Sequence, residues 1–385
     1  MTQLTSDTPP VGANTPHAGG AAPRRAFNFN AGPATLPMPV LQQFEQDLIN
    51  FQGMGAGILE ISHRTAEFHA LVDDALARLR ALLKVPDNYR ILILHGGGQT
   101  HFSIVPYNLM AYRPGRKAIY IETGNFAQRA IAIASRYGYV RVPASSIDTG
   151  FDRIPRWDPA FVDPEASYLH ITTNNTVMGT RWHEFPDTGT VPLVGDMTSE
   201  ILSREIDVSK FGVIYAGAQK NLAPPGLALA IVREDLLGHA LPETPPLLNY
   251  ADHAKDARSI TNTPSTFAVY MMWRMLQWVE AEGGVKVLEA RNEDKVARVY
   301  KVLDASGFYL PHAHPGSRSI QNVTFQLPTP ELLKKFIDEA RAGGLFALAG
   351  HSALGGVRAS MYNPMTVEGA QALADFMVDF ETRHG

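Results

Sequence analysis

The sequence contains no cysteine among its 385 residues. This absence excludes disulfide bonds, thiolate metal sites and a cysteine nucleophile, and we expect no other metal site. The chain also lacks any run of about 18 consecutive apolar residues, so no membrane span is predicted. With 34 basic against 38 acidic side chains, it has no basic excess that would favour nucleic acid or an anionic membrane as a partner.

The N-terminal 25 residues are rich in Pro, Gly, Ala and Thr and lack the continuous apolar core of a signal peptide. We therefore predict a flexible tail over residues 1–25 and, without an export signal, a cytoplasmic location. The remaining length suggests about two domains, at roughly 150 residues per domain. We predict a large domain over residues 26–284 and a smaller C-terminal domain over residues 285–385.

Short apolar runs alternate with helical patterns, which is typical of an α/β fold with a mostly parallel sheet. Residues 67–84 form one such helical pattern, with Leu, Ala and Val at three- and four-residue steps. From residue 285 a long helix, a strand over 319–327, a helix entered at Thr329-Pro330 and a final helix after Thr366 predict a smaller α+β domain. The strands predicted for the large sheet are residues 90–98, 117–124, 167–175, 191–199, 211–219 and 227–235.

Polar residues follow several of these strands, and in open α/β sheets ligands bind beyond the carboxyl ends of the strands. Three glycines at 96–98 precede a helix, where backbone N–H groups could hold a phosphate, although a plain tight turn also explains them. Asp196 could face a cationic ring nitrogen, or could be a turn or cap residue. Asn175 and Thr176 end another strand, where hydrogen bonds within the loop also account for them.

Lys220 stands where a strand ends inside the molecule. Burial disfavours the charged ammonium and lowers its pKa, and the neutral amine can form a Schiff base with an aldehyde. The alternative is a lysine whose stem is buried and whose amine reaches water. Together with the glycines at 96–98 and Asp196, the lysine would bind the aldehyde, phosphate and pyridine ring of pyridoxal 5′-phosphate.

Several motifs identify a family. The most specific is "DVSKFGVIYAGAQKN" at 207–221, and it is supported by "FNFNAGPATLP" at 27–37, "NTPSTFAVY" at 262–270 and "GGVRASMYNPMTVEG" at 355–369. With these motifs the chain resembles the phosphoserine aminotransferases, class V pyridoxal-phosphate enzymes of fold type I. The resemblance implies a large domain with a mostly parallel mixed sheet and a smaller C-terminal α+β domain.

The resemblance also implies roles for individual residues of the cofactor site. Lys220 is the Schiff-base lysine, and Asp196 is the partner of the pyridinium nitrogen. The backbone of Gly98 and Gln99, with Gln219 beside it, binds the cofactor phosphate. The other implied contacts are Thr176 to the ring oxygen, Phe126 stacking on the ring where the family has tryptophan, and Asn262 and Thr263 reaching the cofactor of a second subunit. Such sharing implies a homodimer.

For the substrate, the resemblance implies that Arg358 binds the α-carboxylate by a two-pronged hydrogen bond, although a surface ion pair is the alternative for a lone arginine. His63, Arg64 and His351 are implied to bind the distal anion, and Asn30, which replaces a serine of the family, is implied to bind the substrate. The chain departs from the family at Ser352, where an arginine is usual, and Gln99 stands where some members have another. His101 or a nearby lysine is a candidate to replace the missing cation.

The implied reaction moves the amino group of L-glutamate to 3-phosphooxypyruvate, giving O-phospho-L-serine and 2-oxoglutarate in serine biosynthesis. The departure at Ser352 leaves open a related aminotransferase that acts on a different 3-substituted 2-oxo acid. A non-catalytic protein that kept the fold and the cofactor is a further alternative. A cysteine desulfurase is excluded, because that chemistry needs a cysteine.

Overall fold

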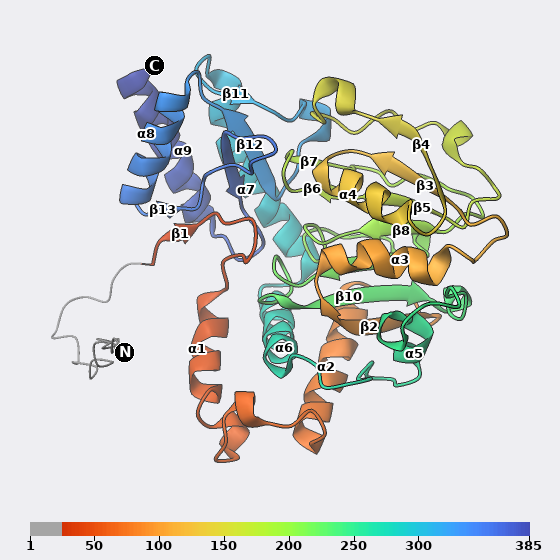
Figure 1. Ribbon diagram of the computed structural model, residues 1–385. Helices are drawn as coiled ribbons and strands as arrows, with labels where there is room; N and C mark the ends of the chain where they lie inside the picture. The colour runs from red at the N-terminus through yellow and green to blue at the C-terminus, as the bar shows by residue number, and fades with distance from the viewer. Residues whose placement is uncertain (1–24) are drawn as a thin grey trace, which may run out of the picture.

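The computed structural model describes residues 25–385 (Figure 1). The predicted tail over 1–25 therefore lies outside the described residues, except for Arg25. Within the described range, no helix combines the length and the apolar character needed to cross a membrane.

A seven-stranded sheet forms the centre of the molecule, in the order β2-β10-β9-β8-β5-β3-β4. Only β10 (Gly226–Arg233) runs antiparallel to its neighbours, so the mostly parallel mixed sheet is confirmed. All six predicted strands are present, whereas the edge strand β4 was not predicted. Its residues are half-buried or exposed and include Pro143, so it lacks the apolar run that marks the buried strands. The other bounds are β2 (Tyr89–Gly96), β3 (Lys117–Glu122), β4 (Tyr139–Ser145), β5 (Tyr168–Thr172), β8 (Leu193–Asp196) and β9 (Val213–Gly217).

Helices cover both faces of this sheet, because successive strand residues point to opposite sides. Ile91 and Ile93 pack in one core with α2 and α6, and Leu92 and Leu94 pack in another with α3 and α4 (Figure 1). Helix α2 begins after Thr65, whose side chain accepts a hydrogen bond from the backbone N–H of Phe68 at 3.2 Å. The helix bounds here are α1 (Met38–Asp47), α2 (Ala66–Leu82), α3 (His101–Leu109), α4 (Asn125–Ala134), α5 (Tyr250–Ala254) and α6 (Thr266–Ala281).

The C-terminal part has a smaller antiparallel sheet and a core of its own, as predicted. Thr329 caps α8 by accepting a hydrogen bond from the backbone N–H of Leu332 at 3.2 Å. The chain start also packs here, because β1 (Phe27–Asn28) pairs with β13 (Leu345–Phe346). The remaining bounds are β11 (Leu310–Pro311), β12 (Asn322–Gln326), β14 (Val357–Ser360), α7 (Val285–Ala305), α8 (Pro330–Ala342) and α9 (Val367–His384), besides the short pair β6 (Asn174–Asn175) and β7 (Thr180–Arg181).

Helix α7 connects the two parts of the molecule. Its first turns place Val285 and Leu288 in the core of the large sheet, and its last turns place Val299 and Leu303 in the C-terminal core. The domain boundary between residues 284 and 285 stays a prediction.

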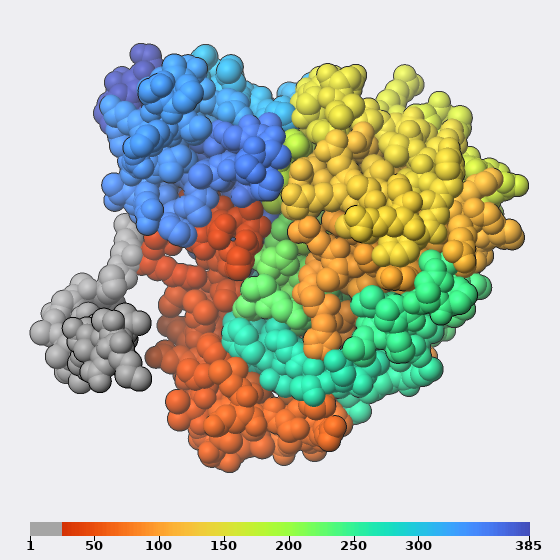
Figure 2. Space-filling view, viewed as in Figure 1, coloured from red at the N-terminus to blue at the C-terminus, as the bar shows by residue number. Residues whose placement is uncertain are grey.

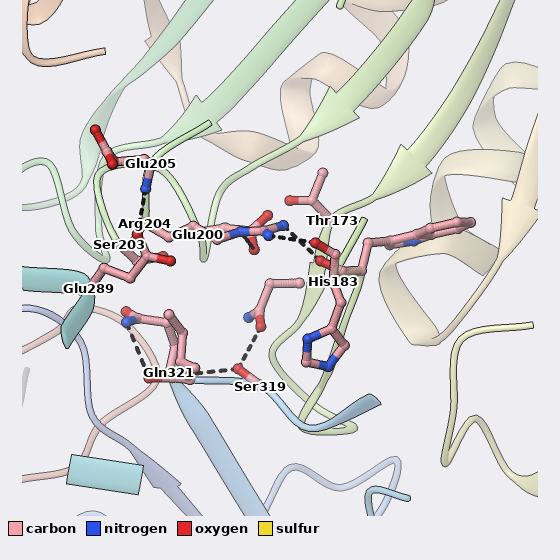
Figure 3. Close-up of polar contacts among 12 residues, drawn as sticks. Thr173, His183, Glu200, Ser203, Arg204, Glu205, Glu289, Ser319 and Gln321 are labelled. Atoms are coloured by element: carbon pink, nitrogen blue, oxygen red, sulfur yellow. Dashed lines mark hydrogen bonds and ion pairs between the residues drawn. The ribbon is translucent and has the colours of Figure 1, made fainter. Parts of the chain in front are cut away.

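Buried polar contacts hold the carboxyl end of the sheet against the C-terminal part. Asn174 donates to Asn322 on β12 at 2.9 Å and accepts a hydrogen bond from Ser319. Because β12 pairs with β14, these contacts fix the position of β14 relative to the large sheet. Figure 3 also shows a buried pair that lies wholly within the large part, in which Arg204 donates to Glu200 at 2.9 Å and to the backbone carbonyls of Trp182 and His183.

Candidate active site

The carboxyl ends of β5, β8 and β9 open onto a pocket whose lining also includes residues of the N-terminal segment and of the C-terminal part. In Figure 2 the blue C-terminal residues border both the red N-terminal segment and the yellow central region. The pocket brings together most of the predicted site residues, namely Gly98, Gln99, Phe126, Thr176, Asp196, Gln219, Lys220, His351 and Arg358.

Lys220 lies directly after β9 and is 8% exposed, so its amine does not reach bulk water. Nζ donates a hydrogen bond to Oγ1 of Thr176 and lies 5.8 Å from the centre of the Phe126 ring. Burial lowers the pKa of Lys220 to about 8; the charge of Arg358 acts in the same direction and that of Asp196 against it. A substantial fraction of the amine is therefore neutral near physiological pH, as a nucleophilic lysine requires.

A first prediction concerns the cost of this buried charge. The pKa of Lys220 is about 8 in the folded chain against 10.5 for an ordinary lysine, so between these values the unfolded chain binds more protons and stability rises with pH. We expect the cofactor-free Lys220→Met variant to be more stable than the native chain at pH 7, by on the order of 3 kcal/mol, and the difference to shrink as pH rises from 8 to 10.5. Urea unfolding at several pH values measures it.

The matched control is Lys210→Met. Lys210 is exposed and forms no ion pair with the residues that the structure describes, so its replacement should leave the pH dependence unchanged. A difference between the Lys220→Met and native proteins that stays constant from pH 7 to 10.5 would contradict a lowered pKa.

Asp196 ends β8, where it is paired with Thr172 on β5 and with Tyr215 on β9. Its Oδ1 accepts a hydrogen bond from the backbone N–H of Thr198 at 2.9 Å. Burial raises the pKa of Asp196, and the hydrogen bonds from Thr198 and the charge of Lys220 oppose that rise. The carboxylate lies in the pocket, where a cationic ring nitrogen would compensate its burial.

The glycines after β2 allow two stretches of main chain to approach closely. A Cβ atom on Gly98 would overlap the hydroxyl of Thr198, and one on Gly217 would lie 2.6 Å from the backbone nitrogen of Gly98. The turn Gly98–Thr100 leads into α3, and the first N–H groups of such a turn have no helical acceptor. This arrangement fits a bound phosphate better than a turn that only reverses the chain.

Arg358 enters the pocket from β14. Its Nε is buried and has no hydrogen-bond partner among residues 25–385, and burial lowers the pKa of the guanidinium. A buried N–H of a half-buried guanidinium is costly to leave without an acceptor, and a bound carboxylate would supply one. The surface ion pair considered for this arginine does not form with any described residue.

Five of the predicted residues do not line this pocket. Asn262 and Thr263 are exposed, and Oδ1 of Asn262 contacts Nε2 of His95 at 3.0 Å. Within one chain the pocket is also not reached by Asn30, His63 and Arg64.

His101, a candidate replacement for the missing cation, lies elsewhere. It is fully buried, stacks on Tyr215 with ring centres 4.9 Å apart, and does not line the pocket. Burial also lowers the pKa of His101 to about 4, so the ring is neutral. The idea that His101 supplies the cation is therefore wrong. Lys220 is the only lysine of the described chain that lines the pocket, so within one chain no nearby lysine supplies the missing cation either.

Two further features were not predicted from the sequence. Thr198 positions Asp196 and accepts a hydrogen bond from the backbone N–H of Gly217 at 3.2 Å. Its place two residues after an aspartate is the usual spacing of a side-chain-to-backbone turn and could have revealed it. Behind Asp196, the hydroxyl of Tyr215 lies 2.9 Å from Nε2 of the buried His170, a contact across the sheet that no local signal indicates.

Comparison with known proteins identifies the family. The family model described as aminotransferase class V matches residues 26–373. The chain belongs to the class V aminotransferases. A phosphoserine aminotransferase of Geobacillus kaustophilus is 48% identical over 94% of this chain and 99% of its own length. One of Laribacter hongkongensis is 47% identical over 93% of this chain and 99% of its own length.

Solved structures agree with this assignment to the class V aminotransferases. The phosphoserine aminotransferase from Bacillus circulans subsp. alkalophilus has a TM-score of 0.90 at 40% identity, covering 94% of this chain and 99% of that one. A pyridoxal-phosphate-bound phosphoserine aminotransferase from Trichomonas vaginalis has a TM-score of 0.87 at 31% identity, covering 92% of this chain and 100% of that one. The fold type predicted from the motifs is thus confirmed.

Proposed function

We propose that this class V aminotransferase uses pyridoxal 5′-phosphate to transfer the amino group of L-glutamate to 3-phosphooxypyruvate, forming O-phospho-L-serine and 2-oxoglutarate. The observation that carries the proposal is that Lys220, Asp196 and Arg358 line one pocket. The relatives of nearly the same length, which are 47–48% identical, support the same reaction. A non-catalytic scaffold would not need all three of these side chains in one pocket.

The residues of the pocket fit the cofactor, and each has a separate role in the reaction. When bound, pyridoxal phosphate supplies an electron sink for the carbanion formed at the substrate Cα. The neutral amine of Lys220 would accept the Cα proton and donate it to C4′ of the cofactor, and in the second half-reaction it would move a proton in the opposite direction. Asp196 keeps a proton on the ring nitrogen, and Arg358 orients the substrate through its α-carboxylate.

We also propose a homodimer in which each site is completed by the other subunit. Asn262, Thr263 and Arg64 are exposed in the single chain, as expected for residues that act on a partner's pocket. Ile49 and Leu59, on the stretch that leads to Arg64, are 75% and 52% exposed, which favours a covered surface. The predicted cytoplasmic location stays a prediction.

Subunit exchange tests the shared site. Lys220→Ala and the double variant Asn262→Ala/Thr263→Ala should each be nearly inactive, but a hybrid dimer would contain one intact site. An equimolar mixture should therefore recover about a quarter of native activity after exchange, as expected for a two-fold symmetric dimer. Turnover is measured after mass spectrometry has verified hybrid formation; no recovery in verified hybrids counts against shared sites.

The acceptor is tested by a panel of 2-oxo acids with L-glutamate as the donor. The proposal expects the highest kcat/KM for 3-phosphooxypyruvate. Ser352 favours one rival, a related aminotransferase for another 3-substituted 2-oxo acid, because the usual arginine is absent. A higher kcat/KM with an unphosphorylated or differently substituted acid would replace the proposal with that rival.

A further inference from the structure

The absence of an arginine at position 352 removes one of the cations that the family resemblance implies for the outer end of the pocket. Ser352 is exposed and carries no charge. His351 lies at this end and lines the pocket, but a phosphate is usually bound by more than one cationic or N–H group. The structure offers another candidate nearby.

Arg129 lies on α4, one turn after Phe126. Its Nη1 is 3.4 Å from Oε1 of Gln99, and its Cζ is 5.8 Å from the centre of the Phe126 ring. Gln99 and Phe126 both line the pocket. Arg129 forms no ion pair with any residue in the described part of the chain, so its charge is not neutralised by a carboxylate.

The lowered pKa of His351 indicates that the positive charge of Arg129 acts at this end of the pocket. Burial lowers the pKa of His351, and the positive charges of Arg358 and Arg129 lower it further. Nδ1 of His351 accepts a hydrogen bond from the backbone N–H of Ala353 at 3.1 Å, so a neutral ring carries its proton on Nε2. The ring is therefore a hydrogen-bond donor in a region of positive potential, which favours an anion.

We propose that Arg129 binds the distal phosphate of the acceptor in this chain and replaces the arginine that is absent at position 352. The inference rests on the proposed phosphorylated acceptor and names the residue that selects it. The weak hydrogen bond to Gln99, at 3.4 Å, holds the guanidinium at the edge of the pocket and leaves its other N–H groups available to a ligand. A bound phosphate offers Arg129 the two-pronged contact for which guanidinium is suited.

The test compares 3-phosphooxypyruvate with 3-hydroxypyruvate, which differ only in the phosphate. In a reaction that proceeds through two half-reactions, kcat/KM for the acceptor does not depend on the donor. We expect Arg129→Gln to lower kcat/KM for the phosphorylated acid by about 10- to 150-fold, the usual effect of one charge-assisted contact. The value for 3-hydroxypyruvate should change by less than about 3-fold.

Arg136→Gln is the matched control, because Arg136 is an exposed arginine just beyond α4 with no ion pair among the described residues. It removes the same charge and should leave the ratio of the two acceptors unchanged. Adding Ser352→Arg to the Arg129→Gln variant should restore most of the lost preference. Competitive inhibition by inorganic phosphate gives a second readout. It should weaken in Arg129→Gln and stay at the native level in Arg136→Gln.

The outcomes separate this inference from the proposed function. If the native enzyme prefers the phosphorylated acid and Arg129→Gln keeps both that preference and its inhibition by phosphate, the role of Arg129 is wrong and the proposed function stands. Equal losses with both acceptors, or weaker binding of the cofactor, would instead mean that Arg129 supports α4 or the cofactor, which also overturns the inference. A native enzyme that does not prefer the phosphorylated acid overturns the proposed function itself.

Discussion

Lys220→Ala should abolish transamination while the chain still folds and still binds pyridoxal phosphate non-covalently. The variant removes both the amine that attaches the cofactor and the base that moves the Cα proton, and proton transfer alone contributes about 10²- to 10⁴-fold. Few polar contacts are lost, because among the residues described the only hydrogen bond of Nζ goes to Thr176. Steady-state turnover with L-glutamate and the best acceptor measures the effect.

The role of Lys220 is best judged against a lysine that lies outside the pocket, and Lys210, just before β9, is such a residue. Lys210→Ala should keep native turnover, since Lys210 is exposed and forms no ion pair within residues 25–385. Circular dichroism and an equilibrium titration with the cofactor establish that both variants are folded and bind it. Retention of a tenth of native activity by Lys220→Ala would rule out its assignment as the essential base.

The sequence predicts the sheet and the centre of the pocket well because both depend on local patterns. Buried strands such as β3 and β9 are continuous apolar runs, and the residues that end them meet at one edge of a parallel sheet. For this reason Asp196 and Lys220 could be placed together before their positions were known. The start of α8 was predicted from Thr329 and the proline that follows it, and Thr329 caps the helix.

What the sequence misses depends on contacts between distant segments. Strand β4 lies at the edge of the sheet, where half-exposed residues carry no clear alternation. Arg129 is a lone exposed arginine on α4 with no motif around it, and only the packing of α4 beside Gln99 and His351 gives it a candidate role. The exclusion of His101 likewise needs its burial against Tyr215, which sequence proximity to the glycines does not reveal.

For Asp196→Asn we expect turnover to fall by about 10²- to 10³-fold, the usual effect of removing one preorganised charged group from a site. The amide cannot keep a proton on the ring nitrogen, so the ring becomes a weaker electron sink. Asparagine retains the oxygen that accepts from the backbone N–H of Thr198, and the glycine turn that fits the phosphate is untouched. Cofactor affinity, measured by fluorescence titration, should therefore change much less than kcat.

Asp207→Asn is the matched control for this prediction, because Asp207 makes the same local turn without facing the pocket. Its Oδ1 accepts a hydrogen bond from the backbone N–H of Ser209 at 3.0 Å, as Oδ1 of Asp196 does from Thr198 at 2.9 Å. If Asp196 were only a turn residue, the two variants would behave alike, with near-native turnover and slightly altered stability. A large loss of turnover that occurs only in Asp196→Asn would show that the negative charge is needed and not the turn. Both substitutions replace a carboxylate with an amide in the same kind of local turn. It would then follow that the carboxylate is kept at the end of β8, despite the burial that raises its pKa, because a cationic ring nitrogen is bound there.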